Sequence, residues 1–188
     1  MRATAIVLTL LATPALAAST ATNYRLDPVN SDVTAKVAFL GLASKTARFP
    51  GMSGSVRLDP DSRTVSKIDV VIDANRLEAP DEVTLQRLRG EKFFWVERYP
   101  QVRFSGDAIT MKDELSGTVA GNLTARGVTN PAVLDVSFSI PPTTAEPDQP
   151  IRITGETIID RRDYGMRSYR LIVGTKVNIR IKATMRPN

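Results

Sequence analysis

The chain of 188 residues contains neither cysteine nor histidine. Without cysteine, a disulfide framework, a thiolate nucleophile and a thiolate metal ligand are all excluded. Without histidine, the commonest zinc, copper and haem ligand sets are lost, together with every triad that uses an imidazole base. Serine–lysine and carboxylate chemistry stay open. The sequence therefore predicts no cofactor and no metal site, and it favours a binding protein over an enzyme.

Long apolar runs are also missing, because no segment after the N-terminus approaches the ~20 residues that a membrane-spanning helix requires. At the N-terminus, Arg2 precedes an apolar stretch at 6–12, and Ala15-Leu16-Ala17 supplies small residues for a signal peptidase. This order predicts a signal peptide, residues 1–17, cleaved after Ala17. We therefore expect a periplasmic or secreted protein whose residues 18–188 form one domain.

Basic residues outnumber acidic ones by 25 to 20, which gives a formal net charge of +5. Such a balance could favour nucleic acid, an anionic membrane surface or an anionic ligand. Export argues against nucleic acid as a partner. The basic residues also alternate with apolar ones, which indicates solvated strand faces.

Alternation of apolar and polar residues with a period of two dominates the rest of the chain. In the clearest case, Val177, Ile179 and Ile181 alternate with charged and amide side chains. This pattern is typical of half-buried antiparallel strands. It predicts strands around 33–39, 68–72, 134–138 and 176–182, with weaker ones near 53–59, 102–111, 115–124 and 151–159. About eight strands with short connections indicate a sandwich or a closed barrel, and a barrel removes the unpaired edges.

Two segments break the alternation. Residues 80–89 carry spaced apolar residues and an acidic first turn, so they predict one short helix that Pro80 opens and Gly90 closes. The aromatic run 93–95 follows it and either caps one end of the barrel or belongs to the ordinary core. Residues 141–150 contain four prolines and predict an exposed hairpin loop.

Groups with chemical potential are few. Asp160-Arg161-Arg162-Asp163 precedes Tyr164, and we interpret these four charges as an ion-pair network in a turn rather than a catalytic site. Gly117 and Gly121 occupy inward positions of one strand, where glycine permits either barrel curvature or the approach of a ligand. An eight-stranded barrel can enclose one small ligand, and an aliphatic lining would suit a hydrocarbon chain.

Four motifs resemble those of a known family, in order and at matching spacing. They are Tyr24-Arg25-Leu26-Asp27-Pro28 with Ser31; Phe93-Phe94 with Tyr99-Pro100 and Phe104; Gly121 to Thr129 (GNLTARGVT) with Pro131; and Arg161, Asp163, Tyr164 and Gly165. With these motifs the chain resembles the YceI-like family of exported polyisoprenoid-binding proteins, from about Tyr24 to Ala183. The resemblance implies an all-β, eight-stranded antiparallel lipocalin-like barrel with one short helix and an elongated apolar channel.

The resemblance also implies ligands and partners. Family members are associated with long isoprenoid chains, such as polyprenyl phosphates or quinone tails, and some are linked to membrane cytochromes of the b561 type. Two positions depart from the family. Asn30 stands where histidine is common, and Thr84-Leu85 stands where an arginine–aspartate pair is common. Any role of those groups in holding a head group or a loop is therefore not transferred to this chain, whereas the apolar channel is unaffected.

The leading hypothesis is a periplasmic carrier of an isoprenoid or similar lipid, with no catalytic residue. Phe93, Phe94 and Trp95 would border one end of the channel. The candidate ligand-binding residues are Val33, Val37, Phe39, Val70, Phe93, Phe94, Phe104, Leu123, Val136, Phe138 and Ile179.

Two other hypotheses stay open. In one, the protein is an accessory module of a membrane redox protein, and the basic strand residues Lys176, Arg180 and Lys182 contact the membrane or the partner. In the other, it is an enzyme on lipid-like substrates that uses carboxylates of 160–163 or Tyr164. Whether the protein forms a homodimer stays open as well.

Overall fold

The computed structural model describes residues 22–59, 64–146 and 148–188, so the expected signal peptide lies outside the described residues. Within these ranges it contains ten strands, one α helix and two short 3-10 helices. The strands are β1 (Thr22–Leu26), β2 (Asp32–Phe39), β3 (Ala43–Pro50), β4 (Ser53–Asp59), β5 (Thr64–Asp73), β6 (Gln101–Met111), β7 (Ser116–Ala125), β8 (Val128–Phe138), β9 (Ile151–Asp160) and β10 (Val173–Pro187). The helices are η1 (Ala74–Arg76), α1 (Glu82–Arg89) and η2 (Arg161–Tyr164).

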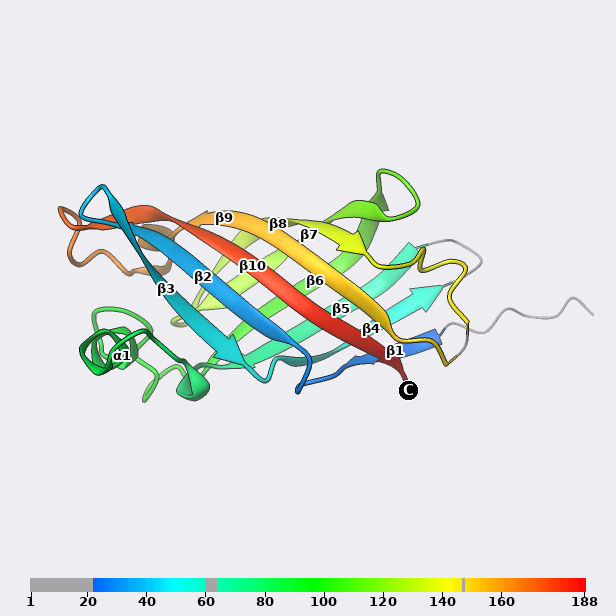
Figure 1. Cartoon of the computed structure of the whole chain (residues 1–188), viewed down its shortest axis with the longest axis horizontal. Helices are drawn as coiled ribbons and strands as arrows, with labels where there is room; N and C mark the ends of the chain where they lie inside the picture. Colours follow the sequence, from blue (N-terminus) through cyan, green and yellow to red (C-terminus); the bar gives the residue numbers. More distant parts are fainter. Residues whose placement is uncertain (1–21, 60–63, 147) are drawn as a thin grey trace, which may run out of the picture.

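Eight of these strands form a closed antiparallel ring. Neighbouring strands pair in the order β1, β4, β5, β6, β7, β8, β9, β10, and β1 then pairs with β10. Tyr24 of β1 lies opposite Val56 on one side and Pro187 on the other. The predicted eight-stranded, lipocalin-like barrel with one short helix is therefore confirmed, and Figure 1 shows its strands running obliquely around a long axis.

The β2–β3 hairpin extends the wall at one end of the ring. The 15 residues of β10 pair with β1 at their C-terminal end and with β2 over the preceding part, where Ile181 lies opposite Val33. β3 pairs with β2 along its length and makes one further bridge, from Arg48 to Glu78. In Figure 1 this hairpin and α1 lie at the same end of the barrel, away from the C-terminus.

The eight strands predicted from alternation are all present, with ends that differ by a few residues. Alternation predicted neither β1 nor β3; Tyr24–Leu26 of β1 belong to the first family motif, whereas β3 was missed altogether. Its first four residues are exposed or half-buried, and only Ala47 and Phe49 are buried. The hairpin lies beyond the closed ring, so most of β3 has no buried face to impose a period of two.

The helix was predicted to open on Pro80, but α1 begins at Glu82 and Asp81 is its N-cap. The Asp81 carboxylate accepts a hydrogen bond from the backbone N–H of Thr84 at 2.8 Å, as helix caps commonly do. Gly90 ends the helix as predicted, although its φ of −72° is not left-handed. Among the described residues, no helix has the length and apolar character needed to cross a bilayer.

The core lies inside the barrel. Along β8 the residues at 132, 134, 136 and 138 are buried and those between them are exposed, as the alternation predicts. Gly121 of β7 marks a close approach within this wall. A Cβ atom at that position would lie 2.6 Å from the Phe104 ring and 2.4 Å from the Ser105 carbonyl oxygen. At Gly121 the glycine therefore serves the packing of the barrel wall rather than the approach of a ligand, because the neighbouring strand already occupies the space.

Candidate functional site: an apolar channel in the barrel

A cavity of about 180 Å³ runs through the interior of the barrel, and we call it the chamber. Inward side chains from strands all round the ring line it, including Leu26, Val56, Ile68, Phe104, Leu134 and Met185. The polar side chains in its lining are Thr157 and Arg161. Apolar walls of this kind favour contact with a hydrocarbon over contact with water.

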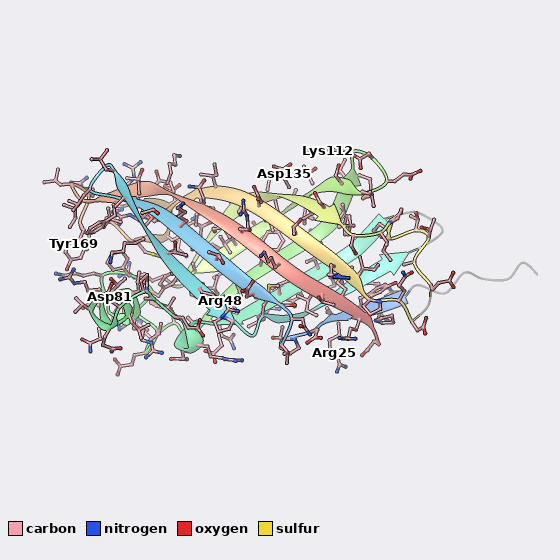
Figure 2. The ribbon with its side chains drawn as sticks, viewed as in Figure 1. Arg25, Arg48, Asp81, Lys112, Asp135 and Tyr169 are labelled. Carbon is pink, nitrogen blue, oxygen red and sulfur yellow. The ribbon has the colours of Figure 1, made fainter. Side chains whose placement is uncertain are left out.

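A second cavity of about 260 Å³, which we call the mouth pocket, lies at the end of the barrel that carries α1. The β2–β3 hairpin, α1 and the segment 166–173 surround it, and its lining is mixed. Lys45 and Asp81 form an ion pair at 2.9 Å, and the hydroxyl of Thr84 donates to Asp81 at 2.8 Å. The ring of Tyr169 stacks on Phe93 with centroids 5.9 Å apart. Figure 2 shows Asp81 and Tyr169 together at this end.

The two cavities meet at a junction lined by residues that belong to both. These residues are Ala35, Phe94, Arg161, Met166 and Val177. Phe94 packs edge-on against Phe49, with ring centroids 5.2 Å apart. The channel is therefore one apolar chamber that adjoins one amphipathic mouth pocket, with an aromatic side chain between them.

All eleven candidate residues from the sequence border these cavities. Val33, Val70, Phe94, Phe104, Leu123, Val136, Phe138 and Ile179 line the chamber, and Val37, Phe39, Phe93 and again Phe94 line the mouth pocket. Trp95, expected beside them, lines neither; it packs edge-on against Tyr99 instead. The assignment of these residues to a bound ligand stays a prediction.

Arg161 is the functional candidate that sequence reasoning missed. Its side chain is 3% exposed and faces inward, while the sequence predicted it in an ion-pair network of the turn. The guanidinium donates to the carbonyl oxygens of Gly174 at 2.8 Å and Val173 at 2.9 Å, and also to that of Met166. Burial lowers the pKa of Arg161. Three backbone carbonyls thus hold a positive charge where the chamber meets the mouth pocket.

The rest of the charged turn does match the ion-pair interpretation. Asp160 accepts from Arg162 at 2.6 Å and lies 4.0 Å from Lys176. The hydrogen bond from Arg162 holds the pKa of Asp160 well below its usual range. Burial raises the pKa of Tyr164 above its ordinary value. Neither group is therefore tuned to exchange protons near neutral pH, and the described residues hold no cluster of three metal-binding side chains.

The basic strand that was considered for membrane contact is largely neutralised. Lys176 lies beside Asp160, and Arg180 pairs with Glu156 of β9 at 2.8 Å. Cross-strand pairs of opposite charge are common on a solvated sheet face. Of the three cations that this hypothesis names, two are thus paired within the sheet, and a fourth cation of β10, Arg186, pairs with Asp27 at 2.9 Å.

A closed antiparallel barrel around an apolar channel, with a polar mouth at one end, defines a lipocalin-like architecture. The sequence pattern of the YceI-like domain matches residues 24–185. The chain therefore belongs to the YceI-like family, as the four motifs indicated.

Curated relatives are similar to this chain over part of its length. A UPF0312 protein of Yersinia enterocolitica is 29% identical over 117 residues, covering 61% of this chain and 60% of that protein. A UPF0312 protein of Enterobacter is 28% identical over 120 residues, covering 63% and 62%. The matches thus span less than two thirds of the length of these relatives.

Two solved structures share the fold at low sequence identity. BcnA of Burkholderia cenocepacia has a TM-score of 0.72 at 21% identity, covering 85% of this chain and 98% of that one. A polyisoprenoid binding domain from Saccharophagus degradans, implicated in plant cell wall breakdown, has a TM-score of 0.68 at 16% identity, with 88% and 98% covered.

Proposed function

We propose that this protein binds an isoprenoid or a similar amphiphilic lipid, with the apolar tail in the chamber. The observation that carries the proposal is the lining of the chamber, where polar side chains are restricted to Thr157 and Arg161. Each CH₂ group that moves from water into such a lining contributes about 0.8 kcal/mol. A long hydrocarbon tail therefore binds without a specific polar partner.

The polar end of the ligand would lie at the mouth pocket. Lys45, Arg87 and Arg161 border that pocket together with Asp81, whose carboxylate is already paired with Lys45. The two arginines leave a positive balance, which suits a phosphate or a quinone carbonyl as the head group.

The two departures from the family have different consequences. Thr84 lines the mouth pocket. The absence of the family's arginine–aspartate pair at 84–85 therefore changes the side chains that would surround the head group. Asn30 lines neither cavity, and its side-chain amide donates to Asp27 at 2.8 Å in a turn. Replacing histidine by Asn30 therefore leaves the proposed ligand site unchanged, and only position 84 bears on ligand choice.

The predicted signal peptide supports a function outside the cytoplasm. A related fold is described as a polyisoprenoid binding domain, which supports the same class of ligand. Together with the predicted signal peptide, this favours a periplasmic carrier that takes no part in nucleic-acid binding. We assign no catalytic residue.

The test is to purify the protein from its natural host and identify co-purified lipid by native mass spectrometry and extraction. We expect one isoprenoid-like molecule per chain. A matched pair of variants locates it. Ala35→Trp fills the junction and should abolish the bound mass, whereas Ala120→Trp on the exposed outer face of β7 should retain it. A ligand-free protein from the host, or retention of lipid by Ala35→Trp, would sink the proposal.

A further inference from the structure

The rim of the mouth pocket carries aliphatic side chains that point into solvent. Leu42 and Leu171 are fully exposed, and Leu40 is 62% exposed. Leu40 and Leu42 lie in the β2–β3 turn, and Leu171 lies in the segment between η2 and β10. The backbone N–H of Leu40 donates to the carbonyl of Ile172 at 2.8 Å, so the two loops lie side by side. We call these three leucines the leucine rim.

The loops that bear the leucine rim are held in place by their own contacts. Leu40 and Tyr169 have φ values of 51° and 56°, in the left-handed region that residues other than glycine rarely adopt. The carbonyl of Tyr169 accepts hydrogen bonds from the N–H groups of Ile172 at 3.1 Å and Val173 at 2.8 Å. Because such backbone persists only where its surroundings hold it, the leucines are displayed by a defined structure.

The two loops that bear the leucine rim contain cations and no carboxylate of their own, although Lys45 is paired with Asp81 and Lys176 lies 4.0 Å from Asp160. Residues 165–176 include three cations and no carboxylate, and residues 38–46 include one cation and no carboxylate. Arg167 and Arg170 are exposed on the loop of Leu171. Lys92 and Arg87 lie over the ring of Tyr169, at 5.6 and 5.9 Å from its centroid. The leucines therefore project from a positively charged surface.

We propose that the leucine rim docks the mouth of the barrel onto an anionic lipid bilayer. Protruding aliphatic side chains flanked by arginines suit the boundary between head groups and acyl chains, where apolar insertion and charge attraction act together. Protein interfaces are built differently, around aromatic and arginine anchors that fill pockets. In Figure 1 both loops lie at the α1 end, so docking would bring the mouth pocket against the membrane.

This inference goes beyond lipid carriage and is tested without any isoprenoid. The purified full chain is sedimented with vesicles of phosphatidylcholine alone, and with vesicles of about three parts phosphatidylcholine to one part phosphatidylglycerol. We expect binding to the anionic vesicles, which Leu42→Ser with Leu171→Ser weakens at least about tenfold. Arg167→Gln with Arg170→Gln should remove the preference for anionic lipid and its sensitivity to salt.

The matched control replaces two exposed aliphatic residues on the outer wall, Val133 and Ile158, by serine, and it should bind vesicles like the wild type. Circular dichroism and thermal unfolding confirm that each variant is folded. Absence of wild-type binding to anionic vesicles overturns the proposal, as does equal binding by the leucine variant. A dimer in sedimentation velocity that the leucine variant dissociates, without vesicle binding, would instead identify the rim as a contact between copies. A negative result with vesicles does not affect the test by lipid extraction from the host, so the two proposals can fail independently.

Discussion

At the scale of single residues, Arg161 points into the barrel, although the charged residues beside it in the sequence predict an ion pair for it instead. Four consecutive charges in a turn predict an ion-pair network, and Asp160 and Arg162 do form an ion pair. Local sequence cannot reveal that the guanidinium of Arg161 points inward, because its partners are backbone carbonyls at 166, 173 and 174. Backbone carbonyls exist at every position, so no residue pattern marks them as ligands of a buried cation.

We expect Arg161→Met to destabilise the fold by about 3 kcal/mol, because it leaves buried carbonyl oxygens without donors. Arg161→Lys should recover part of this loss, since one ammonium can serve fewer of the three acceptors. The control is Arg180→Met, which removes an exposed ion pair with Glu156 and should cost at most about 1 kcal/mol. Urea unfolding of the three variants measures the differences, and equal losses at both positions would contradict the buried role of Arg161.

Two glycines in the barrel wall offer a second matched comparison. A Cβ at Gly121 would lie 2.6 Å from the Phe104 ring, whereas at Gly155 its nearest neighbour would be Ile181 at 3.5 Å, an ordinary contact. Gly121→Ala should therefore destabilise the protein by about 1–3 kcal/mol through overpacking. Gly155→Ala should cost less, because the added methyl enters the chamber without a clash. Thermal unfolding decides this, and a larger loss at Gly155 would count against the packing argument.

At the scale of elements, a strand could be predicted from alternation where one of its faces is buried along most of its length. Strands of the ring have one face in the core, so alternation located seven of the eight; β1, with only five residues, entered the prediction through the first family motif instead. β3 escaped because only its last residues reach the core, and its remaining pairing depends on β2. The helix was predicted with the correct end, but its start was placed on Pro80 because proline suits a first turn. Asp81 took the capping position instead, since its carboxylate satisfies the free N–H of Thr84.

The start of α1 makes the helix sensitive to acid. Hydrogen bonds from Lys45 and then from Thr84 lower the pKa of Asp81 from 3.8 to about 2. Because the folded-state pKa is depressed, the ionised form stabilises the fold above 3.8 and this contribution is lost as the pH falls toward 2. Asp81→Asn keeps a capping oxygen and removes the charge. The difference in Tm between wild type and Asp81→Asn should thus shrink as the pH falls through this window.

The partner of Asp81 supplies the control for this titration. In a Lys45→Met background, the effect of Asp81→Asn on Tm should be smaller at neutral pH, because the ion pair is already broken. A difference in Tm that does not vary with pH would show that the carboxylate acts only as a cap.

At the scale of the whole molecule, alternation predicted the antiparallel sheet, but the family resemblance was needed to choose a closed barrel over a sandwich. Closure rests on the pairing of β1 with β10, two strands from opposite ends of the chain. Nothing local in either strand specifies that contact. The division of the interior into a chamber and a mouth pocket is likewise set by which side chains meet across the barrel, and the sequence alone did not show it.

The junction between chamber and mouth pocket determines how a ligand would enter, and Phe94 is the side chain to remove. Phe94→Ala should speed the uptake of a fluorescent acyl probe, because the two cavities would then be joined by a wider passage. Phe138 lines the chamber and not the mouth pocket. Phe138→Ala enlarges the chamber without opening the junction, so it should leave the rate of uptake unchanged. Stopped-flow fluorescence measures both rates, and equal acceleration by the two variants would mean that entry does not pass Phe94.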